Sequence, residues 1–158
     1  MDWLYKGGTQ SVTVRRKECL MKTSTRCPLI DATQPLVLVA EDDPDQSEML
    51  SDVLQDEGYV VDTAFSGDVA NQKLQKNTYD LIVLDIRMPG MDGETVLKRL
   101  RERERTAHVP VFVVSAFATD SDRQRYAENG ATASFSKPYD IDELIEHVAV
   151  FTKKRSAT

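Results

Sequence analysis

Tyr79-Asp-Leu-Ile-Val-Leu-Asp85 is a largely apolar stretch that ends in a carboxylate, and Ile86-Arg-Met-Pro-Gly-Met-Asp-Gly93 follows it at once. The unbroken apolar residues before Asp85 predict a strand that is covered on both faces, as the strands of parallel sheets are. Open α/β sheets hold their ligands in a crevice at the carboxyl ends of such strands. We therefore expect Asp85 to open into a ligand crevice, with room beside it in the Met88-Pro89-Gly90 turn.

Similar apolar runs recur along the chain, separated by stretches with the spacing of amphipathic helices. The runs lie at about 36–40, 59–65, 81–84, 111–114 and 132–135. Five alternating units of this kind predict the α/β class, with a doubly wound, five-stranded parallel sheet and helices on both faces.

Residues typical of helix ends lie at the boundaries of the predicted helices between these apolar runs. The expected boundary residues are, in chain order, Asp43-Pro44, Gly58, Gly67, Gly93, Asp120 or Ser121, Asn129-Gly130 and Asp140. The spacing of apolar residues also predicts which side chains face the sheet. In the first two helices these are Met49, Leu50, Val53 and Leu54, and then Val69, Ala70 and Leu74.

The bulk composition fits a soluble globular domain and argues against several kinds of partner. The chain has 158 residues, of which 41% are hydrophobic and 29% charged, and its net charge is −6. That charge disfavours general binding to nucleic acid or to anionic membranes. The apolar runs are too short to span a membrane, and no signal-peptide segment opens the chain, so we expect a cytoplasmic location. Glutamates interleave the arginine-rich run 98–105, which favours i,i+4 ion pairs on a solvated helix over contact with DNA.

The sequence divides into three parts, which are a flexible arm (1–33), a globular domain (34–153) and a short tail (154–158). The arm shows neither helical nor strand periodicity and carries the basic cluster Arg15-Arg16-Lys17. Its Trp3-Leu4-Tyr5 segment could dock elsewhere, although a disordered arm is the preferred interpretation. Cys19 and Cys27 have no metal-ligating neighbours, because both histidines lie far downstream, and a disulfide is not expected in the cytoplasm, so we expect reduced thiols.

Polar residues of particular kinds end four of the predicted strands. They are Glu41-Asp42, Asp85, Ser115 and Lys137. Three carboxylates at one edge would repel one another, and a divalent cation removes that penalty. Mg²⁺ prefers such oxygen ligands, while a lysine and a hydroxyl suit the oxygens of an incoming phosphoryl group. The set therefore indicates phosphoryl transfer to an aspartate, which can carry an acyl phosphate.

The segment from about Pro35 to Thr152, roughly three quarters of the chain, resembles the receiver domain of bacterial two-component response regulators. The matching motifs are Leu-Val-Ala-Glu41-Asp42-Asp43, Asp85-Ile-Arg-Met-Pro-Gly-Met-Asp-Gly, Val-Val-Ser115-Ala116 and Phe-Ser-Lys137-Pro138-Tyr139. Each motif is weak alone, but their order and separations also match. The resemblance implies a flavodoxin-like sheet with strand order 2-1-3-4-5.

The resemblance also implies a role for each residue at this edge. Asp85 would accept the phosphoryl group, Ser115 would hydrogen-bond it, and Lys137 would pair with one of its oxygens. Mg²⁺ would be held by four residues: directly by Asp42 and Asp85, through water by Glu41, and by the backbone carbonyl of Arg87. The bond between Lys137 and Pro138 would be cis, which is uncommon enough to be checked.

Two positions depart from the commonest family pattern. Many receivers have Tyr or Phe three residues before the lysine, and here that residue is Ser134. Phe135 is adjacent, but strand alternation predicts that it points to the opposite face. The hydroxyl residue is Ser115 rather than the commoner threonine, and serine keeps the hydrogen bond.

Three functions remain open, and signalling is the preferred one. A histidine kinase or phosphotransfer protein would phosphorylate Asp85, and the domain would then switch its binding to a downstream protein as a monomer or a phosphorylation-dependent dimer. We expect no output domain in this chain, no direct contact with nucleic acid or membrane, and no turnover of an external substrate. The alternative enzyme is a small aspartate-nucleophile phosphohydrolase, which would need a second aspartate where Arg87 stands. A degenerate receiver is disfavoured because the site residues are all present.

Overall fold

A computed structural model of the chain describes residues 34–116 and 118–156. The predicted arm and both cysteines lie outside these residues, so what we expect of them stays a prediction. Within the described residues, the last helix continues through Ser156, beyond the end expected for the globular domain. None of the described helices is long and apolar enough to cross a membrane.

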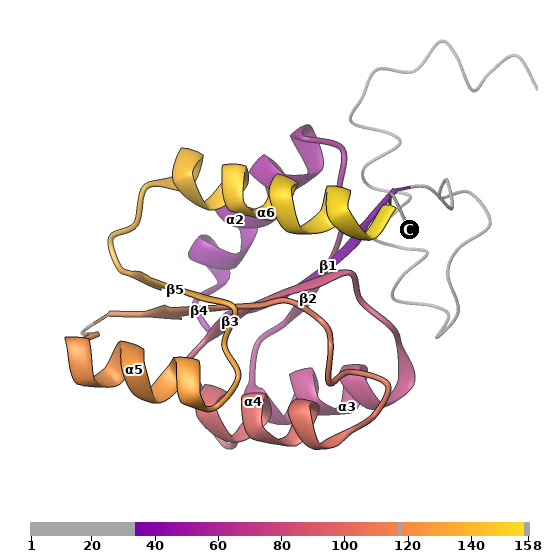
Figure 1. Cartoon of the computed structure of the whole chain (residues 1–158). Coiled ribbons are helices and arrows are strands. Elements are labelled where there is room, and N and C mark those ends of the chain that lie inside the picture. The colour runs from indigo at the N-terminus through magenta and orange to yellow at the C-terminus, as the bar shows by residue number, and fades with distance from the viewer. Residues whose placement is uncertain (1–33, 117, 157–158) are drawn as a thin grey trace, which may run out of the picture.

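Five parallel strands form one sheet in the order β2-β1-β3-β4-β5, which confirms the predicted topology. The strands are β1 (Leu36–Ala40), β2 (Val60–Ala64), β3 (Leu81–Asp85), β4 (Val111–Ser115) and β5 (Ala133–Ser136). The helices are α2 (Pro44–Asp56), α3 (Gly67–Lys76), α4 (Gly93–Glu102), α5 (Asp120–Glu128) and α6 (Ile141–Ser156). Helices α2 and α6 cover one face of the sheet, and α3, α4 and α5 cover the other (Figure 1).

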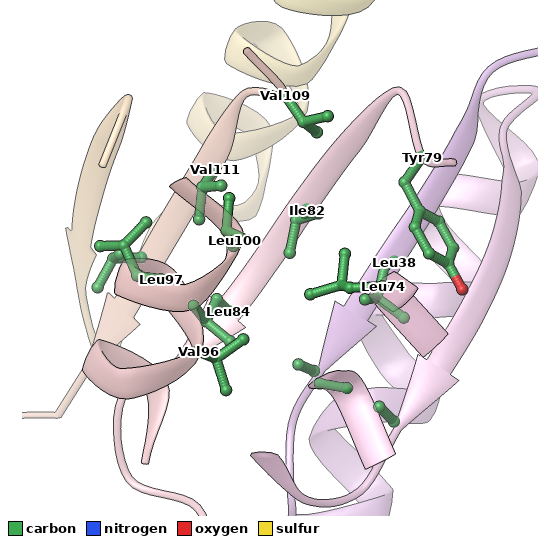
Figure 2. Close-up of a cluster of buried hydrophobic side chains, with 14 of the residues drawn as sticks. Leu38, Leu74, Tyr79, Ile82, Leu84, Val96, Leu97, Leu100, Val109 and Val111 are labelled. Carbon is green, nitrogen blue, oxygen red and sulfur yellow. The ribbon is translucent and has the colours of Figure 1, made fainter. Parts of the chain in front are cut away.

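The three central strands are buried on both faces because alternate side chains enter two different hydrophobic cores. In β3, Leu81 and Val83 belong to the core under α2 and α6, whereas Ile82 and Leu84 belong to the opposite core. Figure 2 shows the second core, in which Ile82 and Leu84 lie between residues of α3 and α4. Asp85 is the first side chain of β3 that is not apolar, so it falls where the strand leaves the core.

Polar side chains cap the N-termini of the helices, and the capping residue of one helix differs from the predicted one. Asp43 caps α2 by accepting from the backbone N–H of Asp45 and Gln46. For α5, the expected cap at Asp120 or Ser121 is wrong, because Thr119 is the capping residue. Its side chain and that of Asp122 form a reciprocal capping box, which satisfies two backbone donors at once.

Two of the apolar side chains that were expected to face the sheet are exposed instead. Met49 is 52% exposed and Val69 is 38% exposed, whereas Leu50 and Leu54 are buried. Helix α3 flanks the outer strand β2, beyond which the sheet does not continue, so part of its apolar face has nothing to cover. The predicted i,i+4 pairing of the run 98–105 is also wrong. Helix α4 ends at Glu102, and Arg101 instead donates to backbone carbonyls, among them those of Val109 (2.7 Å) and Gly130 (2.9 Å).

Candidate functional site

The carboxyl edge of the sheet gathers the polar residues that were predicted to meet there. Glu41 and Asp42 follow β1, Asp85 and Ser115 end β3 and β4, and Lys137 follows β5. Because all five strands are parallel, their carboxyl ends lie at the same edge. The backbone N–H of Lys137 donates to the carbonyl of Ser115 at 2.8 Å, which ties the β5 end to the β4 end.

One ammonium group bridges two buried carboxylates at this edge. Lys137 Nζ lies 2.8 Å from Glu41 Oε2 and 3.2 Å from Asp85 Oδ2. Glu41 and Asp85 are only 8% and 5% exposed, so each needs a compensating charge or hydrogen bonds. Further hydrogen bonds come from the backbone, with Arg87 N–H donating to Asp85 Oδ1 at 3.1 Å and Asp43 N–H to Glu41 Oε1 at 3.2 Å.

Three carboxylates lie close enough to share a metal ion. One oxygen each of Glu41, Asp42 and Asp85 lies within 4.8 Å of the other two. Asp42 is exposed, whereas the other two are buried, so the cluster opens to solvent on the Asp42 side. All the donors are hard oxygens, and the open side leaves room for water ligands, which is the combination that Mg²⁺ prefers. These residues therefore fit a magnesium ion.

Burial sets the ionisation of this cluster. The pKa of Glu41 is raised to about 7, first by burial and then by the neighbouring Asp85, which together outweigh the hydrogen bond from Lys137. Burial alone would lower the pKa of Lys137, but the hydrogen bond with Glu41 and the charges of both carboxylates raise it overall. In the absence of a cation, Glu41 thus holds its proton more readily than an ordinary surface carboxyl group does.

The loop after β3 is shaped by a close backbone approach. Gly93 begins α4, and a Cβ atom there would lie 2.3 Å from the carbonyl oxygen of Asp85. Only glycine lets the helix start this close to the strand end. Beside it lies a shallow pocket lined by Asp42, Ile86, Arg87, Met88, Pro89 and Asp92. Open space therefore borders Met88 and Pro89 of the turn, with Asp42 on its wall, although Asp85 itself does not line this pocket.

A comparison with known protein families identifies the family of this domain. Residues 37–149 match the response regulator receiver domain. The chain is a member of that family. This finding, together with the strand order, confirms the resemblance that the four motifs indicated.

Relatives of the receiver domain occur in different molecular contexts. The DNA-binding dual master transcriptional regulator RpaA of Synechocystis is 34% identical over 120 residues, which are 76% of this chain and 50% of RpaA. A receiver domain of the Francisella response regulator 1452 has a TM-score of 0.73 and 33% identity, covering 77% of this chain and 99% of that one. The chain thus spans about half the length of RpaA, and the whole of an isolated receiver.

A third relative is relevant to the candidate metal site. The receiver domain of the sensor histidine kinase PA1611 from Pseudomonas aeruginosa has a TM-score of 0.70 and 26% identity. The match covers 76% of this chain and 98% of that one, and that structure holds a magnesium ion in its active-site cleft.

The structure bears out the two local predictions that depend on backbone geometry. The peptide bond between Lys137 and Pro138 is cis. Phe135 points into the core under α2 and α6, where its ring lies 5.6 Å from that of Phe112, so it does not replace the missing aromatic residue. Ser134 and Ser136 alternate with Phe135 along β5, and Ser136 accepts a hydrogen bond from Arg123 of α5 at 2.9 Å.

Sequence reasoning missed two groups beside the receiver site. Tyr139 follows the cis bond, and burial raises the pKa of its hydroxyl, with Lys137 opposing the shift. Arg123 reaches the strand end next to Lys137 from a helix that precedes β5. Tyr139 ends the fourth motif, but the sequence gave it no role, and Arg123 had no signal because it is one of several arginines. The chemical roles assigned to the site residues remain predictions.

Proposed function

We propose that this receiver domain accepts a phosphoryl group on Asp85 from a partner histidine kinase or phosphotransfer protein, in the cytoplasm and in the presence of Mg²⁺. The observation that carries the proposal is the bridging position of Lys137, which lies within 3.2 Å of Asp85 at the edge where three carboxylates meet. A buried carboxylate beside a fixed cation and an oxygen-rich cation site is suited to phosphoryl transfer.

The reaction forms one bond and breaks one. A carboxylate oxygen of Asp85 attacks the phosphorus of the donor phosphohistidine, the P–N bond breaks, and the imidazole leaves with the electron pair and takes up a proton. Lys137 pairs with a phosphoryl oxygen, so it must turn from Asp85 Oδ2 toward the new group. Ser115 donates a hydrogen bond to another phosphoryl oxygen from the end of β4.

Four residues hold the cation in this proposal. Asp42 and Asp85 would hold it through their carboxylates, Arg87 through its backbone carbonyl, and Glu41 through a water molecule. Mg²⁺ would supply positive charge that offsets the negative charges of the carboxylate and the phosphoryl group. Arg87 N–H already fixes Asp85 Oδ1, which leaves Oδ2 as the oxygen nearest to Lys137.

Phosphorylation then biases a two-state equilibrium of the domain. Ser115 moves toward the new group and alters the surface formed by α5 and β5, which binds a downstream protein. Ser134 supplies no aromatic ring to report this movement, so the response depends on other contacts along β5. Relatives such as RpaA are named for DNA binding, whereas here we propose that the receiver itself acts through protein–protein contacts, as a monomer or a phosphorylation-dependent dimer.

Incubation of the full chain with acetyl phosphate and Mg²⁺, followed by measurement of the intact mass, tests the proposal. We expect one added phosphoryl group, which is absent in Asp85→Asn and in the presence of a chelator. Asp43→Asn is the matched control, because Asp43 caps α2 and lies outside the carboxylate cluster. A wild-type chain that gains no phosphoryl group would reject the proposal.

We further propose that the chain does not turn over external phosphomonoesters. Aspartate-nucleophile hydrolases need a second acid two residues after the nucleophile, and Arg87 occupies that position. Steady release of phosphate from p-nitrophenyl phosphate, lost in Asp85→Asn, would favour the hydrolase instead.

A further inference from the structure

A largely apolar groove lies away from the carboxyl edge, between α2, the outer strand β2 and the start of α3. Its volume is about 400 Å³. We call it the α2–β2 groove and define it by Ser47, Glu48, Gln55, Asp62, Phe65 and Val69, which all line it. Strand β2 is at the edge of the sheet, and Figure 1 shows α2 and α3 on opposite faces of the sheet.

The groove exposes more apolar surface than its surroundings. Phe65 is 52% exposed and Val69 is 38% exposed. Among the described residues, only two other large hydrophobic side chains are comparably exposed, and both lie outside the groove lining. Contiguous exposed apolar side chains on a small domain commonly mark a contact site.

The floor of the groove also has unused hydrogen-bonding capacity. Ser47 is 1% exposed, yet its Oγ has no hydrogen-bond partner. The buried Oε1 of Gln55, two turns along the same helix, is likewise without a partner. Buried polar atoms are normally hydrogen-bonded, so these two oxygens call for donors from an occupant of the groove.

The edge of β2 itself does not accept a further strand at this point. The backbone N–H of Thr63 donates to Asp62 Oδ1 at 2.9 Å, and its carbonyl accepts from Lys73 Nζ at 2.6 Å. Lys73 also pairs with Asp62 at 2.6 Å. Because side chains already satisfy these backbone groups, the occupant must bind through its own side chains rather than by extending the sheet.

Charge points to the N-terminal arm as the occupant. Residues 1–33 contain six basic and three acidic residues, which gives +3, so the rest of the chain carries −9. Helix α2, which forms one wall of the groove, has four acidic residues and no basic one: Asp45, Glu48, Asp52 and Asp56. A basic segment tethered beside an acidic wall is favoured there over a free acidic partner.

The arm is also attached at the right place. It joins the described residues at Gln34, and the carbonyl of Pro35 accepts a hydrogen bond from the N–H of Val60, the first residue of β2. From that point β2 runs along the groove. About thirty residues separate Gln34 from the start of the arm, enough to reach any part of the groove.

We propose that the N-terminal arm folds back and docks its Trp3-Leu4-Tyr5 segment in the α2–β2 groove. The apolar side chains of this segment cover Phe65 and Val69. The indole N–H of Trp3 and the hydroxyl of Tyr5 are the donors that the oxygens of Ser47 and Gln55 require. The basic residues further along the arm then lie against the acidic side of α2.

Trp3 is the only tryptophan of the chain, so its fluorescence reports docking directly in the full-length protein. In the wild type we expect acrylamide to quench Trp3 less than in the urea-unfolded chain, at any protein concentration. Phe65→Ser and Val69→Ser should each lower the docking equilibrium constant about fivefold, the effect of roughly 1 kcal/mol, and expose Trp3. Val150→Ser is the matched control, because Val150 is 51% exposed on α6 and lies outside the groove.

Leu4→Ser gives a second route to the same result without altering the described domain. It should expose Trp3 as the groove variants do, while the far-UV circular dichroism spectrum of the folded chain stays unchanged, because Leu4 lies outside the domain that gives this spectrum. The proposal is overturned if Trp3 of the wild type is quenched as in the unfolded chain, or if both groove variants leave it protected. Protection that increases with protein concentration would assign the groove to the arm of a second copy and equally overturn docking within one chain.

Discussion

Lys137 Nζ lies 3.2 Å from Asp85 Oδ2, although the two residues are 52 positions apart in the chain. The same nitrogen lies 2.8 Å from Glu41 Oε2, so one cation faces two buried carboxylates. Buried carboxylates are costly without an opposite charge. In the metal-free domain Lys137 therefore stabilises the edge on which the proposed phosphoryl transfer takes place.

Lys137→Ala should destabilise the metal-free domain by about 1–2 kcal/mol, less than a fully buried pair would lose because the lysine is partly exposed. Mg²⁺ should still bind and restore part of this loss. Urea unfolding with chelator and then with Mg²⁺ measures both effects. Lys98→Ala removes an exposed lysine of α4. It should change neither the stability of the metal-free domain nor the stabilisation by Mg²⁺. A normal conformational response of Lys137→Ala to acetyl phosphate would contradict the role assigned to the ammonium.

Asp42 and Asp43 are adjacent acidic residues with different structural roles. Substituting each of them in turn is therefore a matched test of which residue binds Mg²⁺. Asp42 belongs to the carboxylate cluster, whereas Asp43 caps α2. Asp42→Asn should weaken Mg²⁺ binding at least about tenfold. Asp43→Asn keeps an oxygen that can cap the helix and should leave the affinity nearly unchanged. Isothermal titration of each variant decides the assignment, and equal affinities would refute it.

Glu41 makes the stability of the metal-free domain depend on pH. Its pKa is about 7 in the folded domain, against an ordinary value of 4.5. Below pH 4.5 both the folded and the unfolded chain hold the proton, and the contribution of Glu41 to stability is fully present. As the pH rises from 4.5 through about 7, the unfolded chain loses its proton first, so this contribution is lost.

Glu41→Gln removes this titration. In chelator at pH 8, we expect the variant to be more stable than the wild type by about 1 kcal/mol, or roughly 4 °C in melting temperature. The difference should shrink as the pH falls toward 4.5, because the wild-type carboxyl then becomes neutral. Melting temperatures of both proteins across this pH range test the sign of the stability difference between the variant and the wild type. A variant that is less stable than the wild type at pH 8 would contradict the raised pKa.

Gly93 is needed for space rather than for backbone flexibility. An added Cβ would lie 2.3 Å from the carbonyl oxygen of Asp85 and 2.8 Å from the Cα of Ile86, and neither is the movable end of a side chain. Gly93→Ala should cost about 1–3 kcal/mol and, by shifting the end of β3, also weaken Mg²⁺ binding. Gly58→Ala is the contrasting variant, because Gly58 has φ +95° and nothing within 4 Å of an added Cβ. It should cost about 1–2 kcal/mol through strain and leave Mg²⁺ binding unchanged.

The central strands could be predicted from sequence because two buried faces leave an unbroken apolar pattern, as in Leu81–Asp85. Parallel strand ends then bring together Glu41, Asp85 and Lys137 without any further information. Helix faces were less predictable, because periodicity gives the direction of a face but not whether anything covers it. Val69 is apolar and correctly spaced, yet it flanks the outer strand and stays exposed.

Polar contacts away from the carboxyl edge were the least predictable from sequence. Arg101 sits in an arginine-rich run that favoured exposed ion pairs, but its guanidinium reaches carbonyls of two later loops. Thr119 precedes the expected cap by one position, although the three-residue spacing of Thr119 and Asp122 is a capping-box pattern that the sequence does contain. The contacts of Arg101, in contrast, depend on where the chain returns after several elements, which local spacing does not encode.

Helix α5 is held to the domain differently from α4, and this difference should be visible in hydrogen exchange. Tyr126 is its only buried side chain, whereas α4 buries Val96, Leu97 and Leu100. The remaining ties of α5 are polar and exposed, such as the 2.7 Å pair of Arg125 with Glu94. Exposed pairs of this kind contribute little to stability, so local opening of α5 requires less free energy than opening of α4.

Hydrogen exchange followed by mass spectrometry should therefore find the amides of α5 less protected than those of α4 in the unphosphorylated chain. Tyr126→Ala should remove most of the remaining protection of α5, because it deletes the one apolar anchor. Arg125→Ala should have a small effect, since its guanidinium is exposed. Equal protection of the two helices would mean that polar contacts hold α5 as firmly as burial holds α4. That result would count against the easy local movement of α5 that the proposed switch of the α5 and β5 surface requires.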